Sequence, residues 1–437
     1  MSAVSAPAVK LKLRHHIWLP TGSRLIVGSL DKTARHHTVQ LDWKRESSGP
    51  TVSGHTHTAS AFQFCRMSRV PKLLTTEKPK YDGRALPPVE CRNASNARRF
   101  AVPFFAANGS VFERFVVGQL IAAGSTTRLY LDESLLESHA GSEVSHEIIH
   151  LIEIGLREFV EEQLVPIADV DEDQHLTIVM CRLADAQTTK PGEEPLRGCV
   201  REKDFLNRNW AFGGDIIYLD VEQPRDLQLA AVLAHELAHA ATFSAQRMSG
   251  LTDLPGGKLP FWMNEGIAHF LEHSVCNDSD NLRQRLNRYS RQPNAYSLVL
   301  PDDYLNLRVR RGPARAAALS FMSFCASTRS ELLSELVKSQ GEGLDTVEQI
   351  TGESFDTLFR EWSIHESSMT REIPISVSDS PQSVSIAGTS FATFSSPRQS
   401  GFIQITAHAD AALQVTVIEQ SQQTDRLTLA PDTASRN

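Results

Sequence analysis

Residues 230–241 read Ala-Ala-Val-Leu-Ala-His-Glu-Leu-Ala-His-Ala-Ala, and this stretch decides what fold and chemistry the chain can have. It lies in an apolar segment whose helical period begins near Leu227. Residues four apart share a helix face, so His235 and His239 can present two imidazoles to one metal ion. Glu236 can reach a metal-bound water as a general base. Two neutral imidazoles and a carboxylate suit zinc, with one position left open for water.

The same His-Glu-x-x-His pattern occurs a second time, at residues 146–150. It belongs to an amphipathic stretch, 143–164, that predicts a helix. The glutamates that follow His150 all lie on this predicted helix, which cannot fold back to supply a third ligand. We therefore expect His146 and His150 to be packing or solvated residues of a scaffold helix.

Residues 261–272 read Phe-Trp-Met-Asn-Glu-Gly-Ile-Ala-His-Phe-Leu-Glu and predict a second helix with a carboxylate near its start. The two elements together resemble the gluzincin metallopeptidases, the clan that includes thermolysin and the aminopeptidase N type. Their pattern is His-Glu-x-x-His followed by a helix that carries Asn-Glu-Gly or a close variant. The resemblance implies that His235, His239 and Glu265 are zinc ligands and that Glu236 is the base.

The residue spacing after His239 can also be compared with the metal-ligand sets of other zinc peptidases. A metzincin needs glycine and histidine where this chain has Thr242 and Ala245, so that branch is excluded. Asp253, in the loop after the first helix, is an alternative third ligand. His269 shares a helix face with Glu265, as does Glu272, and it is either a residue that orients a ligand or an exposed polar residue.

The region from Asp169 to Cys181, followed by residues 213–220 and the motif helix, resembles the hyicolysin-like bacterial metallopeptidases of this clan. In those proteins an aspartate-rich turn leads into a strand ahead of the catalytic helix. A calcium loop starting at Asp169 would need glycine and glutamate where Gln174 and Met180 stand. We therefore expect a solvated acidic turn.

The resemblance implies peptide-bond hydrolysis of a peptide or protein substrate, with a substrate extended along an edge strand within 198–206 or 215–221. Gluzincins generally have a tyrosine or histidine that stabilises the oxyanion. The predicted helix 313–325 contains neither, and among Tyr289, Tyr296 and Tyr304 we select Tyr304. No Gly-Ala-Met-Glu-Asn motif is present, which favours an endopeptidase.

The expected fold class is α+β. A zincin-like metallopeptidase domain over 99–370, with a small mixed sheet and helices, would lie between a β-rich segment over 1–98 and a β-sandwich-like module with a loose tail over 371–437. Strands are expected at 99–105, 126–132, 176–181 and 215–221. Helices are expected at 227–243, 261–274, 279–290, 313–339 and 354–366. Residues 111–124 suit a strand or a helix.

Composition limits the remaining function classes. The 437 residues include 44 basic and 52 acidic side chains, a net charge of −8 that argues against a nucleic-acid binder. No apolar run is long enough for a transmembrane helix, and no Cys-x-x-Cys pair occurs. No signal peptide is visible, so a cytoplasmic location is the default, whereas the resemblance suggests export. The alternative function is a catalytically inactive, peptidase-like binding or scaffold protein.

Overall fold

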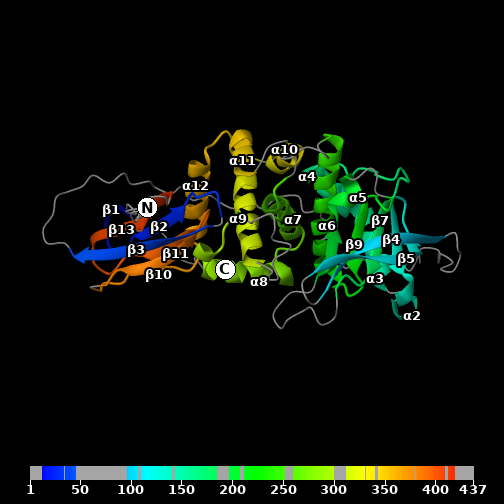
Figure 1. Ribbon diagram of the computed structural model, residues 1–437, viewed down its shortest axis with the longest axis horizontal. Helices are drawn as coiled ribbons and strands as arrows, with labels where there is room; N and C mark the ends of the chain where they lie inside the picture. Colours follow the sequence, from blue (N-terminus) through cyan, green and yellow to red (C-terminus); the bar gives the residue numbers. More distant parts are fainter. Residues whose placement is uncertain are drawn as a thin grey trace, which may run out of the picture.

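The computed structural model places three groups of elements side by side, with a β-sandwich at one end, helices in the middle and a mixed sheet at the other end (Figure 1). The fold is therefore mixed α+β, as the sequence predicted. The described residues are 12–33, 35–45, 96–106, 110–139, 143–184, 196–206, 211–250, 259–299, 312–329, 331–339, 343–378, 380–408 and 412–418.

The mixed sheet has six strands in the order β4-β5-β6-β7-β9-β8. Their bounds are β4 Ala97–Phe105, β5 Val111–Ala123, β6 Thr127–Asp132, β7 Leu176–Cys181, β8 Gly198–Val200 and β9 Ile216–Asp220. The β6, β7 and β9 strands are parallel, and the outer pairings are antiparallel. Strand β7 is buried along its whole length, as expected for a central strand of the sheet.

Helices cover one face of this sheet. They are α3 (Glu143–Leu151), a π-helical turn (Ile152–Leu156), α4 (Arg157–Gln163) and α6 (Asp226–Met248), and they share one apolar core with the sheet. The expected helix 143–164 is thus confirmed, with its irregular turn at Gly155, which has a φ of 125°. Shorter helices are α2 (Leu136–His139) and α5 (Glu202–Leu206).

The helices in the middle of the molecule stack outward from α6. Helix α7 (Phe261–Val275) packs between α6 and α9 (Gly312–Thr328), and α8 (Asp280–Arg291) packs on α9. A side chain at Gly266 would come within 3.1 Å of the Ala318 carbonyl, so this glycine lets α7 and α9 approach closely. The remaining helices are α10 (Leu332–Lys338), α11 (Gly343–Thr351) and α12 (Phe355–Ser367).

The sandwich combines strands from both ends of the described chain. One sheet has the order β1-β13-β3-β11 and the other β10-β12-β2-β14. The N-terminal strands are β1 (Lys12–Leu19), β2 (Arg24–Ser29) and β3 (His36–Arg45). The C-terminal strands are β10 (Ile373–Pro374), β11 (Gln382–Ala387), β12 (Phe391–Ser395), β13 (Gly401–His408) and β14 (Leu413–Ile418).

The predicted division into two separate terminal modules, 1–98 and 371–437, is therefore corrected. Strand β3 lies between β13 and β11, and β2 lies between β12 and β14. Val27 and Trp43 from the first segment share a core with Ile403 from the second. Neither set of short strands can bury its apolar faces alone, so the two segments complete one sandwich.

The sandwich is joined to the helices through α12. Trp362 packs edge-on against Phe391 of β12, with ring centroids 5.4 Å apart. A side chain at Gly28 would meet the Phe359 ring, so β2 also lies directly against this helix. The sandwich and the helical layer therefore share apolar contacts, and α12 connects them in space as well as in sequence.

Most expected elements are present. The ambiguous stretch 111–124 is the strand β5. The expected helix 313–339 is two helices, α9, which ends at Thr328, and α10, which begins at Leu332. The expected elements did not include β1, β12, α2, α5 or α11. Across the described residues, no helix is both long and apolar enough to cross a bilayer.

Candidate metal centre

Helix α6 carries the His-Glu-x-x-His pattern of residues 235–239. A residue of the other such pattern, 146–150, contacts the N-terminus of this helix. Glu147, from residues 146–150, accepts a 2.7 Å hydrogen bond from the backbone N–H of Asp226, the first residue of α6. A carboxylate at a helix N-terminus accepts a hydrogen bond from a free N–H group and interacts favourably with the positive end of the helix dipole. His146 and His150 are partly buried on α3 and belong to none of the metal-ligand groups found among the described residues. The second pattern thus has a structural role.

The three expected ligands come together from α6 and α7. The Nε2 atoms of His235 and His239 lie 3.1 Å apart. Glu265 Oε2 is 3.9 Å from His235 Nε2, and Glu265 Oε1 is 4.0 Å from His239 Nε2. This convergence exists because α6 and α7 pack against each other and Glu265 lies in the first turns of α7.

These separations fit a metal ion. A tetrahedral zinc site with ligand bonds of about 2.0–2.1 Å holds its ligand atoms roughly 3.3 Å apart. The three observed separations lie within 1 Å of that value, and two nitrogens with one carboxylate match the donor preference of zinc. The three residues could therefore hold a metal ion.

Each histidine ring has a polar neighbour at its other nitrogen. His239 Nδ1 donates to Asn264 Oδ1 at 2.9 Å, and His235 Nδ1 lies 3.2 Å from Glu272 Oε2. An N–H at Nδ1 leaves the Nε2 lone pair free to bind a cation. Asn264 thus determines which ring nitrogen His239 presents, whereas Glu272 is a close charged neighbour of His235 Nδ1 without a hydrogen bond of good geometry.

His269 supports this arrangement indirectly. Its side chain is fully buried. The interpretation of His269 as an exposed polar residue is therefore wrong. Its Nδ1 lies 2.7 Å from Glu272 Oε2, while Arg285 Nη1 approaches its Nε2 at 3.0 Å. His235, His269 and Glu272 also form a possible metal-ligand group, in which Glu272 Oε2 lies 3.2 Å from His235 Nδ1 and 2.7 Å from His269 Nδ1.

Arg315, from α9, completes the surroundings of Glu265. Its Nη1 lies 2.9 Å from Glu265 Oε2. Burial raises the pKa of Glu265, but the Arg315 charge and the neighbouring histidines outweigh it and hold that pKa at about 2. Burial and the neighbouring His235 lower the pKa of His239 to about 4, so its imidazole is neutral near pH 7. An ionised carboxylate and a neutral imidazole are the forms that bind metal.

Glu236 lies next to this cluster with a free oxygen. It is buried, and its Oε2 has no hydrogen-bond partner. Burial raises its pKa to about 7. A side chain at Gly198 would come within 2.5 Å of Glu236 Oε1, so β8 passes directly beside this carboxylate. A buried acceptor without a partner is costly unless the site serves another molecule.

Strand β8 is the outer strand of the sheet on this side, whereas β9 lies between β7 and β8. In the described part of the chain, nothing pairs with the outer edge of β8. Of the two candidate edges in the sequence, the 198–206 region therefore supplies the free edge, and the 215–221 strand is internal.

The structure places the remaining candidates as follows. Tyr304 and Asp253 lie outside the described residues. Tyr289 is buried on α8 and belongs to a different cavity. Asp169, Asp171 and Asp173 lie close together, and Arg98 and Arg128 pair with the second and third of them. This turn is therefore partly neutralised by arginines.

The sequence did not indicate several residues of the centre. Arg315 and Arg285 come from α9 and α8, and no local pattern marks them. Asn264 stands in the Asn-Glu-Gly pattern, yet its contact with His239 depends on how α7 packs on α6. No protein-family model matches this chain, and no curated protein matches it significantly. The family resemblance therefore rests on the motif residues alone.

Proposed function

We propose that this protein is a zinc-dependent metallopeptidase of the gluzincin type, with a zincin-like domain, acting as an endopeptidase. The observation that carries the proposal is the convergence of His235, His239 and Glu265 beside the unpaired carboxylate of Glu236. A scaffold protein without activity would not need a buried, unpaired base next to a metal-ligand set.

In this proposal each residue has one task. His235, His239 and Glu265 would hold the ion, which when bound would polarise a peptide carbonyl and a water molecule. Glu236 would accept the proton of the attacking water and pass it to the leaving amine. Asn264 would keep His239 in the ligand tautomer, and Arg315 would keep Glu265 in place.

The free edge of β8 supports an extended peptide as substrate. An added strand along this edge would gain main-chain hydrogen bonds and would run beside Glu236, because Gly198 contacts that carboxylate. An extended chain bound by its backbone can continue in both directions. This arrangement suits cleavage within a chain better than removal of a terminal residue.

The purified protein is expected to contain one zinc ion per chain and to cleave an unfolded substrate such as reduced, alkylated casein. Chelation should remove both the zinc and the activity, and added zinc should restore both, because the ion supplies the electrophile. Elemental analysis and release of peptides measure the two quantities. Zinc binding without cleavage of any member of a broad peptide library would instead favour the inactive scaffold.

Replacing Gly198 by alanine is expected to lower kcat by up to roughly 10²-fold, since a shift of about 1 Å in a catalytic group has effects of that size. The new methyl group would overlap Glu236 Oε1 and displace the carboxylate. The zinc content should not change. Gly124→Ala is the matched control, because its methyl group would press on Glu153 Oε1 in the same way, away from the centre. Equal activity in both variants would contradict the assigned position of Glu236.

A further inference from the structure

A cavity of about 300 Å³, separate from the metal centre, lies among α7, α8, α9 and α12. None of its lining residues belongs to the metal centre. Leu286, Leu319, Phe324 and Met369 supply apolar walls, and Glu366 and Tyr289 supply polar groups. The volume is at the lower end of the range for small-molecule sites, roughly 300–1,000 Å³, which also combine apolar walls with a few polar groups.

The polar groups of this cavity are buried and incompletely paired. Glu366 is 7% exposed, and no described residue forms an ion pair with it. Ser320 is the hydrogen-bond donor to its carboxyl group, and burial raises the pKa of that group to about 7. Tyr289 and His273 also line the cavity. The buried Tyr289 hydroxyl lies near the same Ser320 without a hydrogen bond of good geometry, and His273 Nδ1 has no hydrogen-bond partner. Buried polar groups normally are paired, so these groups make the cavity a candidate site for a polar ligand.

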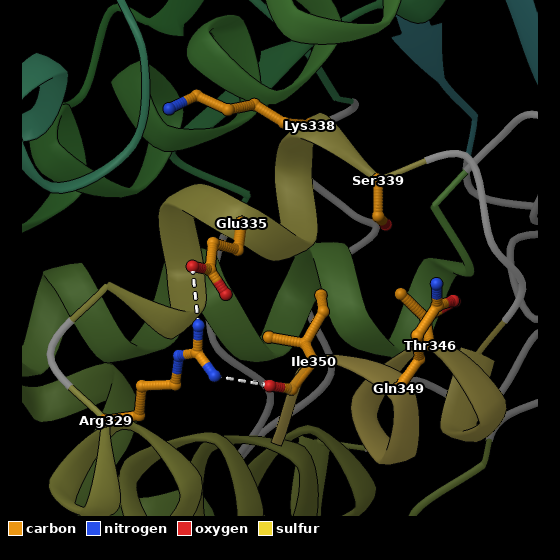
Figure 2. A pocket seen from close by; sticks show the side chains of 7 residues that line it. All are labelled: Arg329, Glu335, Lys338, Ser339, Thr346, Gln349 and Ile350. Carbon is orange, nitrogen blue, oxygen red and sulfur yellow. Dashed lines mark hydrogen bonds and ion pairs between the residues drawn. The ribbon is translucent and has the colours of Figure 1, made fainter. Parts of the chain in front are cut away.

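A larger depression of about 740 Å³ lies between α10 and α11 (Figure 2) and differs in this respect. Arg329 Nη2 donates to Glu335 Oε1 at 2.8 Å, and its Nη1 donates to the Ile350 carbonyl at 2.6 Å. Lys338 is paired with Ser334. The charged groups of that depression therefore have partners within the protein. They give no reason to expect a ligand there.

We infer that the cavity beside Glu366 binds a small organic cation, with a primary ammonium group on an apolar body. The ammonium group would pair with the Glu366 carboxylate, and Tyr289 could accept one of its hydrogens. The apolar body would cover Leu319 and Phe324. A carboxylate buried without a cation is unfavourable, and a ligand of this class would remove that cost.

The cavity shares helices with the metal centre. On α8, Arg285 contacts His269 and Tyr289 faces the cavity one turn later. On α9, Arg315 contacts Glu265 and Leu319 lines the cavity one turn later. Residues four apart lie on the same side of a helix, so the two sites are neighbours along two helices. This relation does not depend on whether the centre has peptidase activity.

The test uses 2-phenylethylamine as the probe, with 2-phenylethanol as its uncharged analogue, and isothermal titration calorimetry on the full-length protein. We expect saturable one-site binding of the amine with a Kd of about 1 mM or tighter, which suits a ligand of this size. The alcohol should bind at least about 10-fold more weakly, and Glu366→Gln should weaken amine binding by a similar factor.

Two further variants complete the test. Glu361→Gln, an exposed glutamate on the same helix, should bind the amine as wild type does. Ser323→Phe, which fills the cavity, should abolish binding and serves if Glu366→Gln does not fold. The inference is overturned if the amine shows no saturable binding, if the alcohol binds equally well, or if binding survives in both Glu366→Gln and Ser323→Phe.

Discussion

The Glu236→Gln variant is expected to lose peptide cleavage by about 10²–10⁴-fold, the usual contribution of a positioned acid–base residue, while it keeps its zinc. Glutamine has nearly the shape of glutamate, so the buried position beside Gly198 remains filled. It cannot accept a proton from water. Initial rates on a quenched fluorescent peptide and elemental analysis of the same preparation separate the chemical step from metal binding.

The second His-Glu-x-x-His pattern supplies the matched control. Glu147→Gln changes the same residue type at the same position of an identical pattern, and its remaining carbonyl oxygen can still accept from Asp226 N–H. This variant should cleave the peptide at the wild-type rate. If Glu147→Gln were inactive and Glu236→Gln active, the catalytic pattern would be the earlier one. Full activity in both variants would mean that neither glutamate is the base.

Loss of zinc is the expected result for Glu265→Gln. The substitution removes the anionic ligand and the carboxylate that offsets the Arg315 charge beside the site. Two imidazoles alone bind zinc weakly, and the guanidinium charge beside them, no longer offset by Glu265, repels a cation. Zinc affinity should fall by more than the roughly 10–100-fold typical of losing an outer hydrogen-bond partner. Competition with a chromophoric chelator measures the affinity directly.

Two comparison variants show where the ion binds. Glu272→Gln, which touches His235 without being a proposed ligand, should lower zinc affinity only by about 10–100-fold. Asp173→Asn changes the other acidic group, the Asp169–Asp173 turn, and should leave zinc binding unchanged. Unchanged affinity in Glu265→Gln would show that another residue, with Asp253 the first candidate, is the third ligand.

Local patterns predicted the elements that depend on local forces. The buried run at 176–181 and the helices at 227–243 and 261–274 are in place because their periodicity and apolar content are present within each segment. The break between α9 and α10 and the pairing of β2 with β12 and β14 were missed. These features depend on what each segment packs against, which a local pattern does not contain.

The candidate metal site likewise has some features that the sequence predicted and others that only the tertiary structure decided. The sequence alone determined that His235 and His239 share a helix face, which follows from helix geometry, and that the Glu265 carboxylate lies near the start of the next long helix. Only the tertiary structure decided that Arg315 and Glu272 surround these ligands, that Gly198 touches Glu236, and that the second pattern anchors α6. Those contacts join α3, α6, α7, α9 and β8, and they exist because burying the apolar faces of these elements brings distant residues together.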